Sequence, residues 1–283
     1  MDGKLVSGRQ HGQQGTISPA SDFNAENTLL KDDIRAELGG HFEDVCIALL
    51  TPLAEYIVDC LYFAIKGDKV DENCLKEILV SLEFRDLCYV KSIFKEKYNE
   101  ELVDFIESSV TSETKHLMSA LLSNERQCSN DIDEQMAMDN ATYLYNEGLS
   151  KSWKSEEFLI NLLATHSKMQ LQATILSFKK IAGYTLSEAI KSEFSGCTRD
   201  ALLSMLECIE NRVAFFATQL YEALKKPKTD DATIIRILVS RSEVDLADIY
   251  EWYHIKYDID LCEAIYADTS GDYRTILLKI LNP

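Results

Sequence analysis

The chain has 283 residues, of which 46% are apolar, and its formal net charge is −18 at pH 7. This acidic balance argues against nucleic-acid binding and against a general attraction to acidic membranes, because both surfaces are polyanionic. No run of about 18 uncharged apolar residues predicts a transmembrane helix, and the polar N-terminus shows no signal segment. The eight cysteines stand singly without a C-x-x-C pair, so we expect reduced thiols in a cytoplasmic protein.

The first 30 residues are polar, and the rest of the chain is patterned for helices. Residues 1–30 are rich in glycine, serine, glutamine and asparagine, which predicts a mobile tail. Between Pro52 and Pro227 there is no proline, and glycine occurs only at positions 67, 148, 183 and 196. Apolar residues recur there with a period of about 3.6 residues, which indicates helix almost throughout. The predicted fold class is all-α.

One helical pattern recurs four times. Near the C-terminus, Asp268 and Gly271 precede a helix whose apolar positions fall at i, i+3, i+4, i+7 and i+8, on one face. Shifts of 75, 159 and 231 residues toward the N-terminus find the same register. From the last copy to the first, the five positions are Tyr273, Ile276, Leu277, Ile280 and Leu281; Thr198, Ala201, Leu202, Met205 and Leu206; Thr114, Leu117, Met118, Leu121 and Leu122; and Phe42, Val45, Cys46, Leu49 and Leu50. Four copies indicate an internal repeat of one helical unit.

The repeat divides the chain into segments. We expect a polar tail over 1–30, a partial first repeat over 31–51, a second repeat over 52–123, a connector over 124–138, a third repeat over 139–209 and a fourth over 210–283. Each complete repeat has room for five helices. The first has room for only its last two, so it is incomplete.

Several motifs resemble those of the annexin family. Thr229–Leu246 and Asp268–Tyr273 are similar to the last repeat of an annexin, and Asp32–Asp44 is similar to part of the first. The resemblance covers about residues 15–282. It implies four helical repeats forming a curved disc whose convex face binds acidic phospholipid membranes through Ca²⁺, in a cytoplasmic, peripheral membrane protein. A block of the family pattern, including the first calcium loop, is missing before Lys31.

The resemblance also implies where calcium would bind. The family motif is K-G-x-G-T between the first two helices of a repeat, with a carboxylate 40 positions after the second glycine. Calcium takes about 6–8 oxygen ligands, and glycine lets backbone carbonyls approach the ion closely. In this chain both glycines of the fourth loop, 225–229, are lysine, although Asp268 is present.

The other repeats are also incomplete as calcium sites. The second keeps Gly67 but has Lys69 for the second glycine and Ser109 for the carboxylate; the third loop is one residue short. We therefore expect calcium binding to be weakened or lost. The residual metal positions are Gly67, Gly148, Glu37, Glu193 and Asp268.

Lysines in these loops predict direct lipid contact. Near an anionic surface each lysine contributes about 1 kcal/mol. The candidates for lipid contact are Lys66, Lys69, Lys151, Trp153, Lys154, Lys226 and Lys228. Trp153 fits either the headgroup level of a bilayer or a packing role, and Lys228 either pairs with Asp268 in place of an ion or points to solvent. The alternative function is a calcium-independent scaffold that binds a protein partner.

Two further expectations concern the core and catalysis. The resemblance implies that Arg241 is a buried core arginine, replaced by Leu82 and His166 in the second and third repeats. Trp252 and Tyr253 lie within a predicted helix, where we expect core positions. There is no P-loop, dinucleotide-binding glycine pattern, H-E-x-x-H or G-x-S-x-G motif, so we expect no enzyme.

Overall fold

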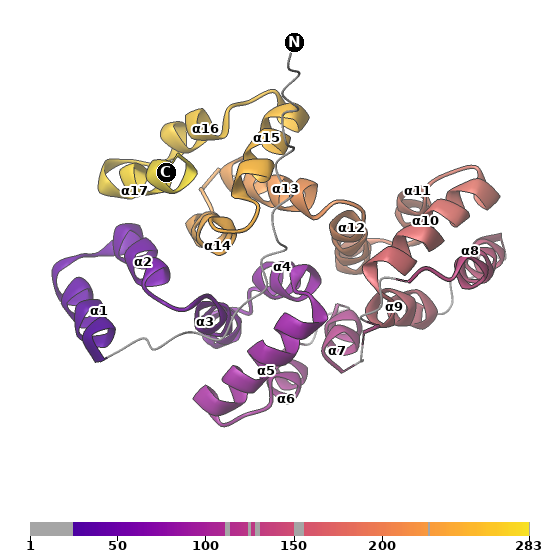
Figure 1. Ribbon diagram of the computed structural model, residues 1–283, viewed down its shortest axis with the longest axis horizontal. Coiled ribbons are helices and arrows are strands. Elements are labelled where there is room, and N and C mark those ends of the chain that lie inside the picture. Colours follow the sequence, from indigo (N-terminus) through magenta and orange to yellow (C-terminus); the bar gives the residue numbers. More distant parts are fainter. Residues whose placement is uncertain are drawn as a thin grey trace, which may run out of the picture.

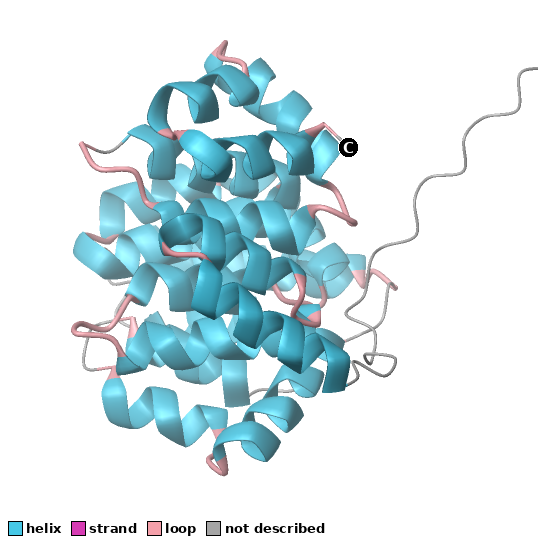
Figure 2. Ribbon diagram, turned by 90° about the vertical axis from the view of Figure 1, so that its left-hand side faces the viewer, coloured by secondary structure: helices cyan, strands magenta, loops and turns pink. Residues whose placement is uncertain are grey.

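A computed structural model describes residues 25–110, 114–123, 126–127, 131–149, 156–225 and 227–282. In these residues the structure has 17 helices and no strand, which confirms the all-α class (Figure 2). The helices are α1 (Ala25–Glu37), α2 (Gly40–Leu49), α3 (Leu53–Lys66), α4 (Glu72–Ser81), α5 (Phe84–Tyr98), α6 (Leu102–Ser109), α7 (Lys115–Ser123), α8 (Glu134–Leu149), α9 (Glu156–Thr165), α10 (Lys168–Ala182), α11 (Leu186–Glu193), α12 (Gly196–Glu210), α13 (Arg212–Lys225), α14 (Asp231–Arg241), α15 (Leu246–Tyr257), α16 (Leu261–Asp268) and α17 (Gly271–Leu281). None of these described helices combines the length and apolar character that crossing a bilayer requires.

The helices group into four repeats. Helices α3–α7, α8–α12 and α13–α17 form complete five-helix repeats, and in each the first helix packs on the third and the fourth on the fifth. Helices α1 and α2 are the last two of the truncated first repeat. Figure 1 shows the four groups in cyclic order around a centre bordered by α3, α4, α13 and α14. This arrangement is the predicted array of helical repeats.

The second and fourth repeats reproduce each other's contacts at an offset of 159 residues. Tyr62 of α3 stacks on Tyr98 of α5, with ring centroids 3.9 Å apart. Tyr221 of α13 stacks on Tyr257 of α15 in the same way, at 3.7 Å. The aromatic pair therefore fixes how the first and third helices cross in both repeats.

Two helices begin earlier than the sequence pattern indicates. Helix α1 begins at Ala25, inside the expected tail, and α8 begins at Glu134, inside the expected connector. The early start of α8 has a clear cause. The Asp133 carboxylate accepts a hydrogen bond from the backbone N–H of Met136 at 2.9 Å and caps the helix. The Gln170 side chain bonds both the N–H and the carbonyl of Asp133, at 2.8 and 2.9 Å.

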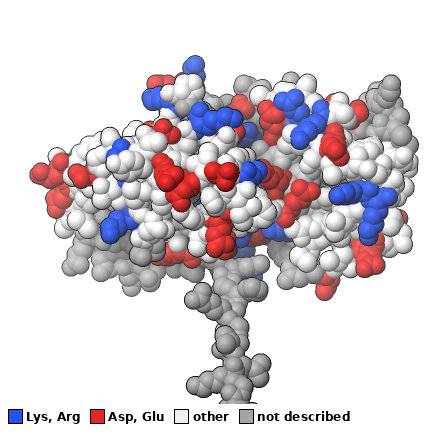
Figure 3. All heavy atoms as spheres, turned by 90° about the horizontal axis from the view of Figure 1, so that it is seen from above, with Lys and Arg blue, Asp and Glu red and all other residues white. Residues whose placement is uncertain are grey.

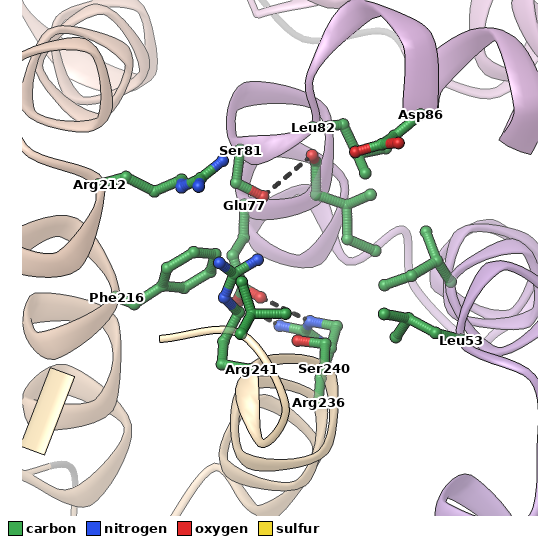
Figure 4. A pocket seen from close by; sticks show the side chains of 13 residues that line it. Leu53, Glu77, Ser81, Leu82, Asp86, Arg212, Phe216, Arg236, Ser240 and Arg241 are labelled. Atoms are coloured by element: carbon green, nitrogen blue, oxygen red, sulfur yellow. Dashed lines mark hydrogen bonds and ion pairs between the residues drawn. The ribbon is translucent and has the colours of Figure 1, made fainter. Parts of the chain in front are cut away.

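A buried ion pair crosses the centre of the molecule. Arg236 of α14 and Glu77 of α4 are each 4% exposed and form two hydrogen bonds, Nε to Oε1 at 2.9 Å and Nη2 to Oε2 at 2.6 Å (Figure 4). Burial by itself would lower the pKa of the guanidinium, but the facing carboxylate raises that pKa well above its ordinary value. The pair therefore remains charged and joins the second repeat to the fourth.

Arg241 is held within its own repeat, and its counterparts differ. Its guanidinium forms two hydrogen bonds of 2.7 Å to Asp245 and lies 4.8 Å from the Phe216 ring centroid. In the third repeat the equivalent residue is His166, whose pKa burial lowers despite a bond to the Leu162 carbonyl. Neutral imidazole cannot replace the arginine fork, so the third repeat has no equivalent ion pair at this place.

The prediction for the two adjacent aromatic residues of α15 is half right. Tyr253 is 1% exposed, as expected, whereas Trp252 is 39% exposed. The buried stripe of α15 follows Ile249 and Tyr253 at a spacing of four residues. Trp252 lies about 100° around the helix from Tyr253, so it falls outside the stripe.

The described cysteines are all free thiols with different exposure. Cys74 and Cys208 are buried, Cys88 and Cys197 are exposed, and Cys46 is intermediate rather than fully in the core. Burial raises the pKa of the Cys208 thiol to about 12. Because the thiolate is the reactive form, the buried thiols should be inert while the protein is folded.

Replacing Glu77 by Gln should lower the free energy of unfolding by about 3–5 kcal/mol, because Arg236 would remain buried without its counter-charge. Asp32→Asn, which breaks an exposed pair with Arg35, should cost less than about 1 kcal/mol. Urea denaturation of both variants measures the difference. If both variants lost the same free energy of unfolding, the buried pair would contribute no more to stability than an exposed one.

Thiol labelling should separate the cysteines into two kinetic classes. Cys88 and Cys197 should react with an aromatic disulfide reagent at once in the native protein, and Cys74 and Cys208 only on unfolding, because burial raises the pKa of both buried thiols. Mass spectrometry of labelled peptides identifies the sites. Rapid native labelling of Cys208 would contradict the packing described above.

Candidate functional site

The loops between the first and second helices close in the same way in repeats two and four. The backbone N–H of Asp71 donates to the Ala64 carbonyl at 2.7 Å, and that of Asp230 to the Ala223 carbonyl at 3.0 Å. Each aspartate then caps the following helix: Asp71 Oδ1 accepts from the N–H of Cys74, and Asp230 Oδ1 from that of Thr233. The second loop keeps a glycine and the fourth has lysines and a proline, so this closure does not depend on glycine.

Gly67 has a steric reason to be glycine. It ends α3, and a Cβ atom there would lie 3.3 Å from the Phe63 carbonyl oxygen and 3.6 Å from that of Lys69. The first contact is tighter than a methyl group normally makes. Glycine therefore allows the loop to turn closely over the end of α3, whether or not a metal is bound.

The junctions between the fourth and fifth helices share a second geometry. Exposed carboxylates end α1, α11 and α16 at Glu37, Glu193 and Asp268. Three residues after each carboxylate comes a glycine with positive φ: +62° at Gly40 and +60° at Gly196 and Gly271. This left-handed conformation favours glycine, which has no Cβ atom. The three carboxylates therefore occupy equivalent exposed positions.

The described lysines of these loops are exposed. Lys66, Lys69 and Lys228 all lie at the surface, and the Lys66 ammonium is 5.1 Å from the Phe105 ring centroid. Among the residues that the structure describes, Lys228 and Asp268 form neither an ion pair nor a hydrogen bond with each other. The pair suggested as a substitute for the ion is therefore not formed in this structure.

The remaining predicted positions are placed as follows. Gly148 lies in the last turn of α8 and Ser109 is the last residue of α6. Lys151, Trp153, Lys154 and Lys226 lie outside the described residues.

The described donors fit a calcium site poorly. In the described part of the chain, no three or more His, Cys, Asp and Glu side chains converge to hold a metal. Calcium would therefore depend on backbone carbonyls, as in the family motif. In the second repeat, however, an ammonium at Lys69 and a hydroxyl at Ser109 replace a glycine and a carboxylate. In the fourth, Asp268 is exposed at the end of α16, but Lys228 brings a positive charge to the loop between α13 and α14.

Two cavities lie near the centre. One, of about 60 Å³, is lined by both residues of the Glu77–Arg236 pair (Figure 4). The other, of about 420 Å³, lies between α2, α3, α4 and α14 and is lined partly by Tyr56, Phe63 and Ile235.

The sequence pattern did not single out Arg236 or Glu77. An arginine inside the apolar run 234–238 was the available signal.

The surface charge is mixed at the edge of the molecule. Figure 3 shows several basic side chains along the upper rim of that view, with acidic side chains among and below them. A chain with an overall charge of −18 thus still presents local groups of cations. Such groups can act at short range on an anionic surface, because salt screens the more distant carboxylates.

Comparison with known proteins agrees with this geometry. The family model described as Annexin matches residues 56–121, 139–205 and 215–280. The chain is 38% identical to Annexin A3 of Mus musculus over 251 residues, which cover 89% of this chain and 78% of that protein. It is 33% identical to Annexin B10 of Drosophila melanogaster over 279 residues, covering 98% and 87%.

Solved structures agree as well. The structure of annexin III superposes with a TM-score of 0.86 at 35% identity, covering 90% of this chain and 79% of that one. Calcium-bound annexin (Sm)1 superposes with a TM-score of 0.79 at 27% identity, covering 90% and 76%. The repeated helix order, the recurring carboxylate-to-glycine junctions and these matches together show that the chain belongs to the annexin family.

Proposed function

We propose that this annexin binds acidic phospholipid membranes with a reduced requirement for calcium. The family is known for calcium-dependent phospholipid binding, and its members are in general non-enzymatic. The observation that carries the proposal is the exposed lysine, Lys69 or Lys228, at the second glycine position of two calcium loops. The proposal assigns the chain no catalytic step and places it at a cytoplasmic membrane surface.

The physical argument concerns the sign of one charge. An ammonium in the loop repels a divalent cation, and the repulsion is strongest at the short distances within a binding site. The same ammonium is attracted to an anionic lipid surface by about 1 kcal/mol. Replacing glycine by lysine therefore exchanges a bridging ion for a direct contact. Lys66 and Lys225, which end α3 and α13, add charge beside the same loops.

The third repeat supports a residual calcium response. Glu193 is exposed at a junction with the same backbone geometry as the other two, and the position 40 residues before it holds Trp153 rather than a lysine. We propose that any remaining calcium dependence comes mainly from this repeat. Gly148, Glu193 and Asp268 remain the residual metal positions, together with Gly67 and Glu37.

Vesicles rich in phosphatidylserine should sediment the protein both with calcium and with a chelator present. Raising the salt concentration should release it in both cases, because direct lysine contacts are screened. Vesicles of phosphatidylcholine alone serve as the control. Sedimentation only in the presence of calcium would contradict the reduced requirement, and none under either condition would overturn membrane binding.

Restoring glycines should restore calcium dependence in the fourth repeat alone. The double variant Lys226→Gly, Lys228→Gly recreates the family loop opposite Asp268. We expect it to lower the calcium concentration for half-maximal sedimentation on the order of tenfold. Lys69→Gly is the matched control, because Ser109 supplies no carboxylate. An equal gain from both variants, or a gain from neither, would show that the lysines do not control calcium binding.

A further inference from the structure

The four equivalent fifth helices differ sharply in how well they are covered. The side chains at the five apolar positions of the repeat pattern are all buried in the second repeat, where α7 carries the pattern. Their exposed fractions lie between 2% and 4%. In α12 all five are buried as well, between 0% and 7%. Of the five pattern positions in and beside α2, only Val45 is buried and Leu49 is 43% exposed, and of the five in α17 only Leu277 is buried. The same sequence pattern is thus covered in two repeats and partly open in the other two.

The contacts of the second helices explain the difference. Helix α4, the second of its repeat, packs on its own fifth helix α7 and on α12 across the molecule. Helix α14 does the same for α17 and α2. A second helix of the first repeat would contact α2 and α17 from the other side, but that part of the repeat is missing. Among the described helices, only α14 bridges this pair.

We propose that the open surface of α2 and α17, flanked by α1, docks an amphipathic helix of a partner protein. The open surface is defined by partly or largely exposed apolar side chains: Leu30, Phe42, Leu49, Ile276, Ile280 and Leu281. Figure 1 places α1, α2 and α17 at one edge of the molecule. This role is separate from membrane binding through the loops and does not depend on it.

The open surface specifies the chemistry of its occupant. The second helices that cover fifth helices elsewhere, α4, α9 and α14, are 10, 10 and 11 residues long. A partner helix of about three turns with an aliphatic stripe therefore matches the open surface in length. Helices α1, α2 and α17 together carry seven carboxylates and four lysines or arginines. Lysine or arginine on the polar side of the partner helix would complement that charge.

A second copy of this chain does not match the open surface as well. The second helix of each complete repeat already packs within its own molecule: α4 packs on α12, α9 on α7 and α14 on α2. Freeing one of these helices to bind a second copy would disrupt the hydrophobic core of its own repeat. The sequence of residues 1–24 has no apolar pattern at i, i+3, i+4 and i+7, so it predicts no amphipathic helix that would fit this surface. A helix from another protein is the occupant that requires no unpacking.

The test uses the full chain and a helix-stapled peptide with the sequence of residues 230–242. This peptide copies α14, the helix that already covers the opposite side of α2 and α17. We expect saturable binding by fluorescence anisotropy, weakened at least about tenfold by Leu49→Glu and by Ile280→Glu. Leu176→Glu is the matched control, because Leu176 is 60% exposed on α10, away from the open surface. A second peptide carrying D230N and D231N should bind more tightly than the first at low salt.

Each outcome decides the proposal. Loss of binding in L49E and I280E with full binding in L176E supports it, provided that thermal unfolding shows the variants to be folded. Absence of saturable binding, or equal binding by L49E and the wild type, overturns it. Sedimentation showing a dimer that L49E dissociates would also overturn it, because the occupant would then be a second copy. Vesicle sedimentation should be the same for L49E and the wild type, which separates this test from that of membrane binding.

Discussion

The charged pair between Glu77 and Arg236 constrains the arrangement of the repeats. It is nearly inaccessible to water, with 4% exposure on each side chain, and its two hydrogen bonds fix both distance and angle. Because the first repeat is reduced to α1 and α2, fewer helices join the fourth repeat to the rest of the molecule. The pair links α14 directly to α4, so the loops that precede these two helices keep a defined spacing.

Much of the fold could be predicted from the sequence, because the same spacing of apolar residues recurs in the last helix of each repeat. The exceptions have local physical causes. The start of α8 depends on Gln170, which lies 37 residues from Asp133 and bonds its backbone; no local pattern reveals that contact. Trp252 was misplaced because a run of aromatic residues hides which of them follows the buried stripe. The open faces of α2 and α17 were also invisible, since exposure depends on a neighbour and not on the register itself.

The candidate site was less predictable than the fold. The motif located the loops and the three exposed carboxylates, and their common backbone geometry agrees with that placement. Whether a lysine contacts a carboxylate depends on side-chain direction, which spacing does not determine. Lys228 and Asp268 are 40 residues apart, as the family motif requires, yet among the described residues they remain unpaired with each other. The apolar run around Arg236 indicates that this arginine is buried, but only the fold identifies Glu77 of α4 as its partner.

The loops of the second and fourth repeats close with the same backbone hydrogen bond, although only one of them keeps a glycine. The loop of the fourth repeat has no glycine, yet its backbone bond from Asp230 to Ala223 matches that from Asp71 to Ala64 in the loop that keeps Gly67. Closure is therefore supplied by the flanking helices and the capping aspartates. In the fourth repeat, the loss of both glycines of the family motif therefore leaves the closure intact. The residues of these loops can therefore change while the helices of the repeats keep their packing, so selection on the loops can act independently of selection on the core.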